Sequence, residues 1–303
     1  MEKDFHLKTL SSTVDFFMKK YGFPNSFKSE MGKTTDALSE KDIKKLLSFY
    51  PSPAKLDFNG LKDEVKRLSD AYKIDLRTLN LFTFTLLTPK LFDFSAAAGV
   101  KKSVTIDTVR DFKCKYDECK RVCGIDGIRQ WDWYKNFFTL KLFALGRLQF
   151  EIRPFNADVY KKDGRILRRG EPALAVHIPQ TGEPLLFSEC EKSYALAKAF
   201  FKTHFNELFG GDYVPFTCNS WLLYPENRDI LPKTSNVLRF AERFNLVEWG
   251  EFDDFNAISP WVFDKERIED PADIPENTAM QRALKRRLKD GKKLGWGFGA
   301  FFF

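Results

Sequence analysis

His177 is one of only three histidines in the sequence, and it lies near the end of an apolar run, residues 173–178. A histidine that faces a ligand can take a proton from an amine or bind a carbonyl oxygen. Glu151, which alternates with apolar residues in an earlier run, is a second candidate base. Both also have structural interpretations: His177 as a hydrogen-bonded histidine within a sheet, and Glu151 as the ion-pair partner of Arg147 or Arg153.

Cys218 and Ser220 lie two residues apart in a second strand-like run, residues 216–223, so their side chains share one face of that strand. Either side chain could give a proton to a leaving thiolate, and Cys218 could also act as a nucleophile beside His177. The sequence around Cys218 has no nucleophile-elbow motif, and no third member of a catalytic triad is evident. Proton donation is therefore the favoured role of this pair.

Composition limits the classes of partner. The net charge of +7 is compatible with an anionic partner such as a phosphorylated cofactor or a nucleic acid. The basic run near the carboxyl end surrounds Leu284 and Leu288 at helical spacing, which is typical of a solvated face of an amphipathic helix, so nucleic acid is not the expected partner. Cys114, Cys119 and Cys123 lack the spacing of a structural zinc site, and we expect no metal.

The cysteine count and the amino terminus bear on the location of the protein. Five cysteines are an odd number, and the first residues are followed by no apolar signal core, so we expect a cytoplasmic protein without a disulfide framework. The most apolar long window, residues 79–100, is interrupted by Asp93 and by Pro89 beside Lys90. We expect this window to lie in the core of the fold, and we expect no membrane association.

A strand, helix and strand must position the candidate side chains. Residues 173–178 predict a strand that is buried on both faces, and residues 216–223 predict a second strand. Ser188 and Glu191 have the spacing of a capping box, which predicts the start of a long helix between the strands. This connection is long enough for the strands to lie parallel with a right-handed crossover. Ligands of such units bind beyond the carboxyl ends of the strands.

The periodicity of the sequence changes near residue 143. Before it, short apolar faces recur at helical spacing; after it, Leu148, Phe150 and Ile152 alternate with polar residues, as in a strand with one polar face. Asp163 and Gly164 predict a hairpin turn between strands. Further helices are expected over 236–244, capped by Ser235 or Thr234, and over 278–291, capped by Thr278 with Gln281. Further strands are expected over 246–252, 258–263 and 295–303.

We therefore expect an α+β fold in two domains. A helical domain occupies residues 1–138, and a mixed β-sheet flanked by helices occupies residues 139–303.

The order of several short motifs resembles that of a known family. These motifs are Leu-Gly-Arg-Leu-Gln-Phe-Glu at 145–151, Val-His-Ile-Pro at 176–179, Asn-Ser-Trp-Leu-Leu at 219–223, Ser-Asn-Val-Leu-Arg-Phe at 235–240 and Thr-Ala-Met-Gln-Arg at 278–282. The family comprises two-domain bacterial acyltransferase-like proteins. Their helical N-acyltransferase amino-terminal domain precedes a carboxyl-terminal domain that resembles the GNAT superfamily.

The resemblance implies a reaction and its ligands. The co-substrate would be acyl-CoA or acetyl-CoA, with its pantetheine arm in a notch between strands 173–178 and 216–223. The acyl group would pass to an amine of a small-molecule or peptide acceptor, while a backbone amide of residues 176–178 polarises the thioester carbonyl. The residues expected to contact the co-substrate are Val176, Ile178, Gln180, Thr181, Gly182, Asn219 and Asn236, with the loop after 178 at the pyrophosphate.

The sequence departs from the GNAT pattern in two places. GNAT enzymes usually carry Gln/Arg-x-x-Gly-x-Gly/Ala in that loop, whereas residues 180–184 supply one glycine, Glu183 and a proline. Many also place a tyrosine on the next helix as the acid for the thiolate, where this chain has Phe240 and Phe244. An alternative function is therefore a GNAT-shaped binding or regulatory module without transferase chemistry, since fold alone does not decide function.

Overall fold

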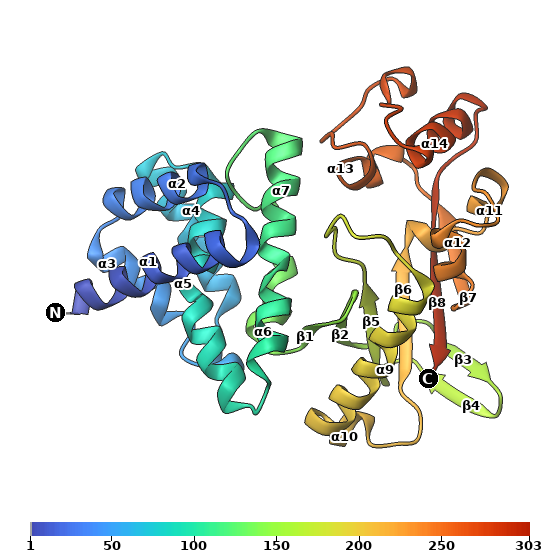
Figure 1. The fold of residues 1–303 in the computed structure, drawn as a ribbon, viewed down its shortest axis with the longest axis horizontal. Helices are drawn as coiled ribbons and strands as arrows, with labels where there is room; N and C mark the ends of the chain where they lie inside the picture. The colour runs from blue at the N-terminus through green and yellow to red at the C-terminus, as the bar shows by residue number, and fades with distance from the viewer. Residues whose placement is uncertain (1) are drawn as a thin grey trace. The chain divides into compact units, whose positions relative to one another are not determined.

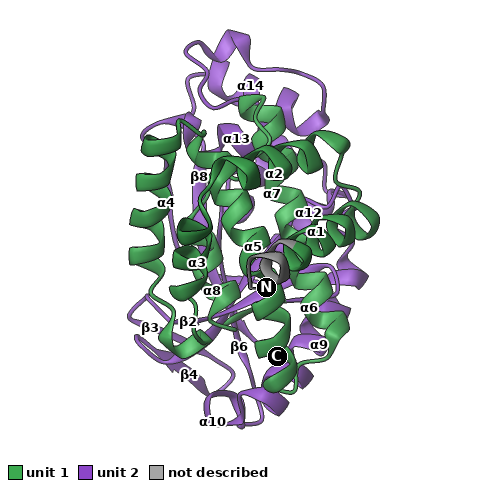
Figure 2. Cartoon of the chain, turned by 90° about the vertical axis from the view of Figure 1, so that its left-hand side faces the viewer, with its two compact units in different colours: residues 1–143 green, residues 144–303 purple. Residues whose placement is uncertain are grey.

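The computed structural model describes residues 2–303, with side chains from residue 8 onward (Figure 1). The chain divides into two compact units, residues 1–143 (unit 1) and residues 144–303 (unit 2), shown in different colours in Figure 2. The domain boundary expected between residues 138 and 139 stays a prediction. Helices make up unit 1 and a mixed sheet with flanking helices makes up unit 2, so the predicted α+β class is confirmed.

Unit 1 is built around a central buried helix. Every residue of α5 from Thr78 to Thr88 is buried, and the hydroxyls of Thr85 and Thr88 donate to carbonyls one turn earlier, which satisfies polar groups inside the core. The helices of the unit are α1 (Glu2–Tyr21), α2 (Asn25–Ala37), α3 (Glu40–Ser48), α4 (Phe58–Tyr72), α5 (Leu76–Ala97), α6 (Lys102–Val109), α7 (Asp111–Cys123) and α8 (Lys135–Phe138).

Aromatic rings fill much of the core of unit 1. The ring of Phe84 on α5 lies 4.8 Å from that of Trp131, 4.6 Å from that of Tyr134 and 5.6 Å from that of Phe138, measured between centroids. Tilted ring pairs at such distances stabilise a core beyond the area that they bury. The apolar window of residues 79–100 thus begins in the core, as expected, and none of the helices described from residue 2 onward is long and apolar enough to cross a bilayer.

Unit 2 is built on a six-stranded sheet with the order β1-β2-β5-β6-β8-β7. β5 and β6 are parallel, whereas β2–β5, β6–β8 and β7–β8 are antiparallel. The predicted parallel strand pair is therefore confirmed. The strands are β1 (Leu142–Leu145), β2 (Leu148–Pro154), β5 (Pro172–His177), β6 (Pro215–Ser220), β7 (Asn245–Glu251) and β8 (Gly295–Phe302); β3 (Val159–Lys162) and β4 (Arg165–Arg168) form the predicted hairpin.

The two faces of this sheet are covered differently. α9 (Phe187–His204) lies on one face, where Tyr194 contacts the rings of Phe150, Phe216 and Phe301. The β3–β4 hairpin covers part of the other face, where its Tyr160 stacks on Phe302. Phe301 and Phe302 are consecutive in β8, so they must point to opposite faces.

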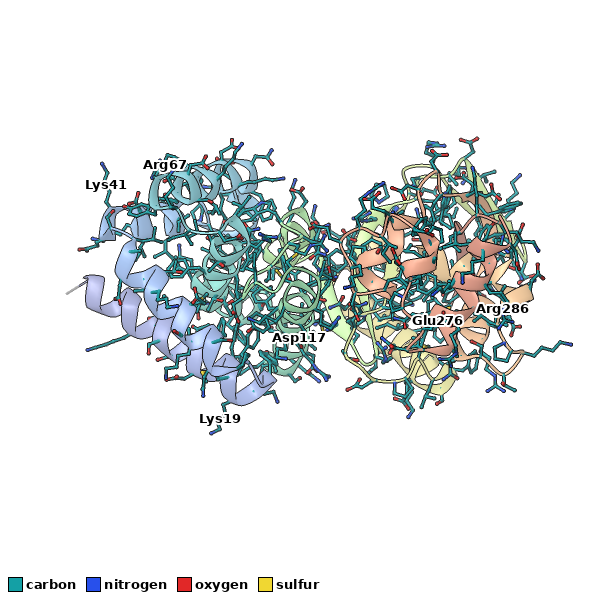
Figure 3. The ribbon with its side chains drawn as sticks, turned by 90° about the horizontal axis from the view of Figure 1, so that it is seen from above. Lys19, Lys41, Arg67, Asp117, Glu276 and Arg286 are labelled. Atoms are coloured by element: carbon teal, nitrogen blue, oxygen red, sulfur yellow. The ribbon has the colours of Figure 1, made fainter. Side chains whose placement is uncertain are left out.

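The remaining helices of unit 2 are short, apart from α14. They are α10 (Asn206–Phe209), α11 (Asn227–Ile230), α12 (Asn236–Ala241), α13 (Ser259–Val262) and α14 (Ala279–Lys289). The capping box of Thr278 and Gln281 is present at α14, and Ser235 caps α12, as predicted. Leu284 is buried while Arg286 points outward, like Lys19 and Lys41 of unit 1 (Figure 3), which agrees with an amphipathic α14.

Some predicted element bounds are wrong. α9 begins at Phe187 with Leu186 at its N-cap and no side-chain cap, so Ser188 and Glu191 lie inside the helix and form no capping box. Residues 258–263 form no strand: a 3-10 helix (Phe255–Ile258) leads into α13 there. Pro260 explains the difference, because proline suits the first turn of a helix and cannot donate to a sheet.

Candidate active site

A notch opens between the parallel strands β5 and β6. Within the described residues these strands pair only at Leu174 with Phe216 and at Ala175 with Thr217. Beyond this point β5 stays paired with β2 as far as His177, and β6 stays paired with β8 as far as Ser220. Each strand therefore follows its outer neighbour beyond the paired segment, and we call the unpaired region between residues 176–178 and residues 218–220 the notch.

A turn that packs on β8 follows the end of β6, the strand that forms one side of the notch. The strand predicted over 216–223 stops at Ser220, and Trp221–Leu223 forms a 3-10 helix whose Leu222 N–H donates to Ser220 Oγ at 3.1 Å. This helix lies directly against Gly297, where a Cβ would be 2.5 Å from the carbonyl oxygen of Leu223. Glycine at this position of β8 therefore allows the chain to turn away from β5.

His177 and Glu151 lie together beside the notch. β2 and β5 pair Glu151 with Ala175 and Gln149 with His177, which makes Glu151 and His177 diagonal neighbours on one face of the sheet. His177 Nε2 is 2.7 Å from Glu151 Oε2, and Arg153 Nε is 2.7 Å from the same oxygen. The side chain of Glu151 is 1% exposed and that of His177 is 25% exposed, so His177 is the member that solvent can reach.

The charge on Glu151 defines what His177 can do. Burial raises the pKa of Glu151, but the hydrogen bonds and charges of His177 and Arg153 together hold this pKa below its ordinary value. Glu151 is therefore ionised at neutral pH and accepts a hydrogen bond from Nε2–H of His177. This bond selects the tautomer in which Nδ1 of His177 is the nitrogen that can accept a proton.

Cys218 and Ser220 differ in what they can contribute. Cys218 is 2% exposed on the face that α9 covers, and burial raises the pKa of its thiol to about 12, so the thiol stays protonated at neutral pH. Ser220 is half-buried at the end of the strand, and its oxygen accepts from Leu222 N–H, which leaves its own hydrogen to be donated. The exposed Asn219 lies on the opposite face, which is also the face of His177.

The predicted co-substrate contacts in the loop of residues 179–184 have partners within unit 2. Gln180 Nε2 donates to the carbonyl oxygen of Trp261 at 2.9 Å. Thr181 Oγ1 accepts from the backbone N–H of Glu183 at 3.3 Å, and Gly182 has a positive φ of 78°. The backbone N–H of Thr181 also donates within the loop, to the carbonyl oxygen of Pro179 at 2.9 Å. An anion would therefore be bound by other backbone amides of this segment.

Arg147 has contacts that the sequence analysis did not predict. Considered there only as a partner of Glu151, it donates to three carbonyl groups of the 179–184 loop. No local signal indicated this, because the loop is more than thirty residues away. Asn236 is the first residue of α12, and its contact with the co-substrate stays a prediction.

A mixed sheet whose two central parallel strands separate around a notch, with a helical crossover between them, defines a GNAT-like domain. The family model described as the GNAT-like C-terminal domain matches residues 142–301, and that of the N-acyltransferase N-terminal domain matches residues 27–140. The chain belongs to the family of proteins with this GNAT-like C-terminal domain. The resemblance to a two-domain acyltransferase family is thereby confirmed.

Solved structures of an acyltransferase share this fold. One, in complex with CoA and 10C-teicoplanin, has a TM-score of 0.72 and 21% identity, and the match covers 95% of this chain and 86% of that one. Another, with decanoyl-CoA and teicoplanin, has a TM-score of 0.66 and 22% identity over 88% and 84% of the two chains. A variant with octanoyl-CoA has a TM-score of 0.65 and 23% identity over 87% and 84%. A search of the curated proteins found no match.

Proposed function

We propose that this chain is an N-acyltransferase that moves an acyl group from acyl-CoA to an amine. The observation that carries the proposal is the His177–Glu151 pair beside a notch between two separating strands. The family supports it, since both matched family models describe acyltransferase-type domains. The notch offers a place for an extended thioester arm, and the pair offers a base for the attacking amine.

The similar structures suggest the substrate class. One holds decanoyl-CoA with teicoplanin, one holds octanoyl-CoA, and one holds CoA with 10C-teicoplanin. By analogy, the donor of this chain is a medium-chain acyl-CoA and the acceptor is an amine on a small molecule or peptide. Among the described residues, no three or more His, Cys, Asp or Glu side chains form a group that could hold a metal ion. The proposed chemistry uses no metal.

The mechanism assigns a role to each side of the notch. The pantetheine arm lies along the open edge of residues 176–178, where a backbone N–H donates to the thioester carbonyl oxygen. The amine attacks this carbonyl carbon and forms the C–N bond, while its proton passes to Nδ1 of His177, directly or through a water. The tetrahedral intermediate then collapses, the C–S bond breaks, and the thiolate of CoA accepts a hydrogen bond from Ser220 and takes its proton from solvent.

Cys218 has no nucleophilic role in this mechanism. Its thiol is buried on the face covered by α9, and its raised pKa keeps it protonated. Direct transfer to the amine needs no acyl-enzyme. Ordered kinetics with a ternary complex, and not ping-pong kinetics, are therefore expected.

The test measures binding first and turnover second. The melting midpoint is recorded with CoA, and release of free thiol from decanoyl-, octanoyl- and acetyl-CoA is then followed over a panel of amines that includes teicoplanin. The proposal expects stabilisation by CoA and acceptor-dependent thiol release. CoA binding without turnover over the panel would support the binding module instead. Absence of CoA binding would overturn the proposal. A cytoplasmic location stays a prediction.

A further inference from the structure

The loop of residues 179–184 must present donors if it is to bind a phosphate. Backbone N–H groups that point outward from a loop before a helix attract anions. A run of glycines usually makes such a conformation possible, but this loop has only Gly182. Another part of the chain must therefore hold its peptide groups in their orientation.

Arg147 holds the loop by its carbonyl groups. Its Nη1 donates to the oxygen of Pro179 at 3.1 Å, its Nη2 to that of Glu183 at 2.9 Å, and its Nε to that of Pro184 at 3.2 Å. One planar guanidinium thus gathers three carbonyl oxygens from both ends of the loop. A lysine could not replace this fork, because an ammonium group is a compact point charge.

The turn that carries Arg147 is itself fixed on α9. The backbone N–H of Arg147 donates to Ser193 Oγ at 2.8 Å, and Ser193 Oγ donates to the carbonyl of Glu189 at 2.8 Å. Gly146 has a φ of 75°, and a Cβ there would lie 2.7 Å from Ser193 Oγ, so only glycine fits. The guanidinium therefore reaches the loop from a rigid base on the same helix that the loop precedes.

Because of peptide geometry, the contacts of Arg147 also orient backbone N–H groups of the loop. In a trans peptide the C=O of one residue and the N–H of the next point in opposite directions, and the structure has no cis peptide among its described residues. Since the carbonyls of Pro179 and Pro184 point toward Arg147, the N–H groups of Gln180 and Leu185 point away from it. The positive charge of Arg147 also offsets the nearby Glu183.

We propose that Arg147 is a positioning residue for phosphate binding. It orients the 179–184 loop so that the amides of Gln180 and Leu185, together with the first turn of α9, bind a nucleotide diphosphate, the pyrophosphate of the co-substrate. The hydrogen bonds of Arg147 stabilise a loop conformation that additional glycines would make accessible in a glycine-rich loop. This inference rests on the proposed function, because it assigns a part of the same acyl-CoA site.

The experiment separates the diphosphate from the rest of the ligand. Calorimetry gives the Kd of CoA and of pantetheine, which lacks the diphosphate, for the wild type, Arg147→Ala, Arg147→Lys and Arg169→Ala. Arg169 follows β4, is exposed and pairs with Asp158, so its removal matches the charge change without touching the loop or α9. Arg147→Ala should weaken CoA binding about tenfold and Arg147→Lys by less, whereas pantetheine binding and the Arg169→Ala variant change by less than about twofold.

The possible outcomes are distinct. Unchanged CoA affinity in Arg147→Ala overturns the inference while the proposed function stands. Equal weakening of CoA and pantetheine also overturns it, because Arg147 would then support the notch as a whole. A wild type that binds neither ligand removes the proposed function, and the inference with it, before any variant is measured. Thermal melts verify that each variant is folded. If Arg147→Ala does not fold, the comparison of CoA with pantetheine is made with Arg147→Lys.

Discussion

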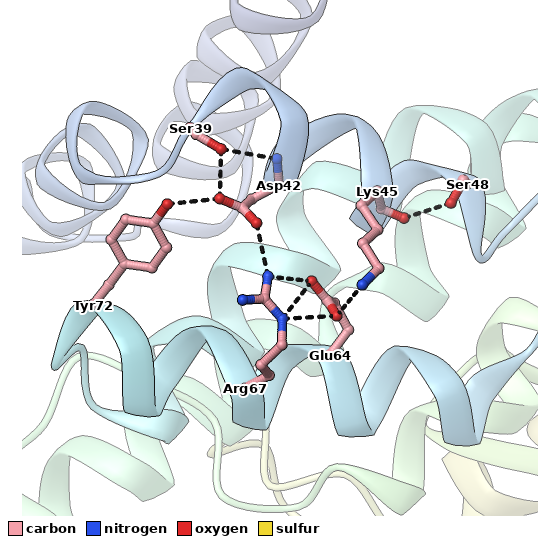
Figure 4. A network of polar contacts seen from close by, with 7 residues as sticks. All are labelled: Ser39, Asp42, Lys45, Ser48, Glu64, Arg67 and Tyr72. Carbon is pink, nitrogen blue, oxygen red and sulfur yellow. Dashed lines mark hydrogen bonds and ion pairs between the residues drawn. The ribbon is translucent and has the colours of Figure 1, made fainter.

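Glu64 in unit 1 and Glu151 in unit 2 are both buried carboxylates with two cationic partners. Glu64 is 5% exposed; it accepts hydrogen bonds from Arg67 Nε at 3.1 Å and pairs with Lys45 at 2.7 Å (Figure 4). Glu151 is 1% exposed and is bound by Arg153 and His177 at 2.7 Å each. The difference lies in the type of partner, because Glu151 binds a histidine, the residue type that serves most often as a general base, whereas the partners of Glu64 are an arginine and a lysine.

The two carboxylates also lie in different surroundings. The network of Glu64 joins α3 to α4, and Arg67 extends it to Asp42, which also binds Tyr72 (Figure 4). It connects two helices, and the residues drawn in Figure 4 include no histidine. The network of Glu151 lies on a sheet beside an open notch, and its histidine is partly exposed. A buried carboxylate thus becomes part of a candidate active site when its partner can exchange a proton and can be reached.

The largest effect is expected from His177→Ala. Removal of a positioned base reduces turnover by roughly a hundredfold to ten-thousandfold, and we expect thiol release from the best donor and acceptor to fall by this amount. Arg153 still pairs with the buried Glu151, so the protein should stay folded, with a melting midpoint below that of the wild type because Glu151 loses one hydrogen-bond partner. Thiol release and a thermal melt measure the two quantities on the same preparation.

His204→Ala is the matched control for this variant. His204 ends α9, far along the helix from the notch loop, and its ring contacts Phe200 at 4.5 Å between centroids. It should retain the turnover of the wild type. Equal turnover in both histidine variants would remove His177 from the mechanism.

Glu151→Gln should have the next largest effect. The amide keeps the shape of the side chain but lacks the charge that fixes the His177 tautomer, so we expect turnover to fall by roughly tenfold to a hundredfold. The fall should be smaller than for His177→Ala, because the imidazole remains. Steady-state thiol release gives kcat and KM separately for this variant. Turnover equal to that of the wild type would contradict the positioning role of Glu151.

Glu64→Gln should separate stability from activity. We expect turnover to stay at the wild-type value, while the free energy of unfolding at neutral pH falls by about 1–3 kcal/mol, because Arg67 and Lys45 lose their charged acceptor. Hydrogen bonds with Arg67 hold the pKa of Glu64 below its ordinary value. Its stabilisation is therefore complete above the unfolded pKa of about 4.3 and is lost as the pH falls below it. The stability difference between wild type and variant, from urea titrations, should shrink below about pH 4; a constant difference would contradict this.

Local patterns made several parts of this fold predictable. Asp163 and Gly164 form the turn of a hairpin, and Thr278 with Gln281 caps α14, because each signal is complete within a few residues. The end of β6 was not predictable in this way. It depends on Gly297, which is distant in the sequence and becomes a neighbour only when β8 pairs with β6. The prediction of where α9 begins was wrong for a similar reason, since the loop before this helix is held by the contacts of the distant Arg147.

The candidate site shows the same limit. His177 and Glu151 were each identifiable by residue type and by strand pattern, but their contact depends on the β2–β5 register. A slip of one residue would put them on opposite faces of the sheet, and no sequence pattern defines that register over 26 residues of separation. The structure therefore adds the pairing, and with it the tautomer of His177.

Arg153→Gln should have the smallest effect and sharpens the comparison most. The side chain of Arg153 is 57% exposed, and exposed ion pairs contribute about 0–1 kcal/mol, so turnover should stay within about threefold of the wild type. A loss as large as that of Glu151→Gln would show that Glu151, like Glu64, depends on its permanent cation, and that the histidine is not what distinguishes the two carboxylates.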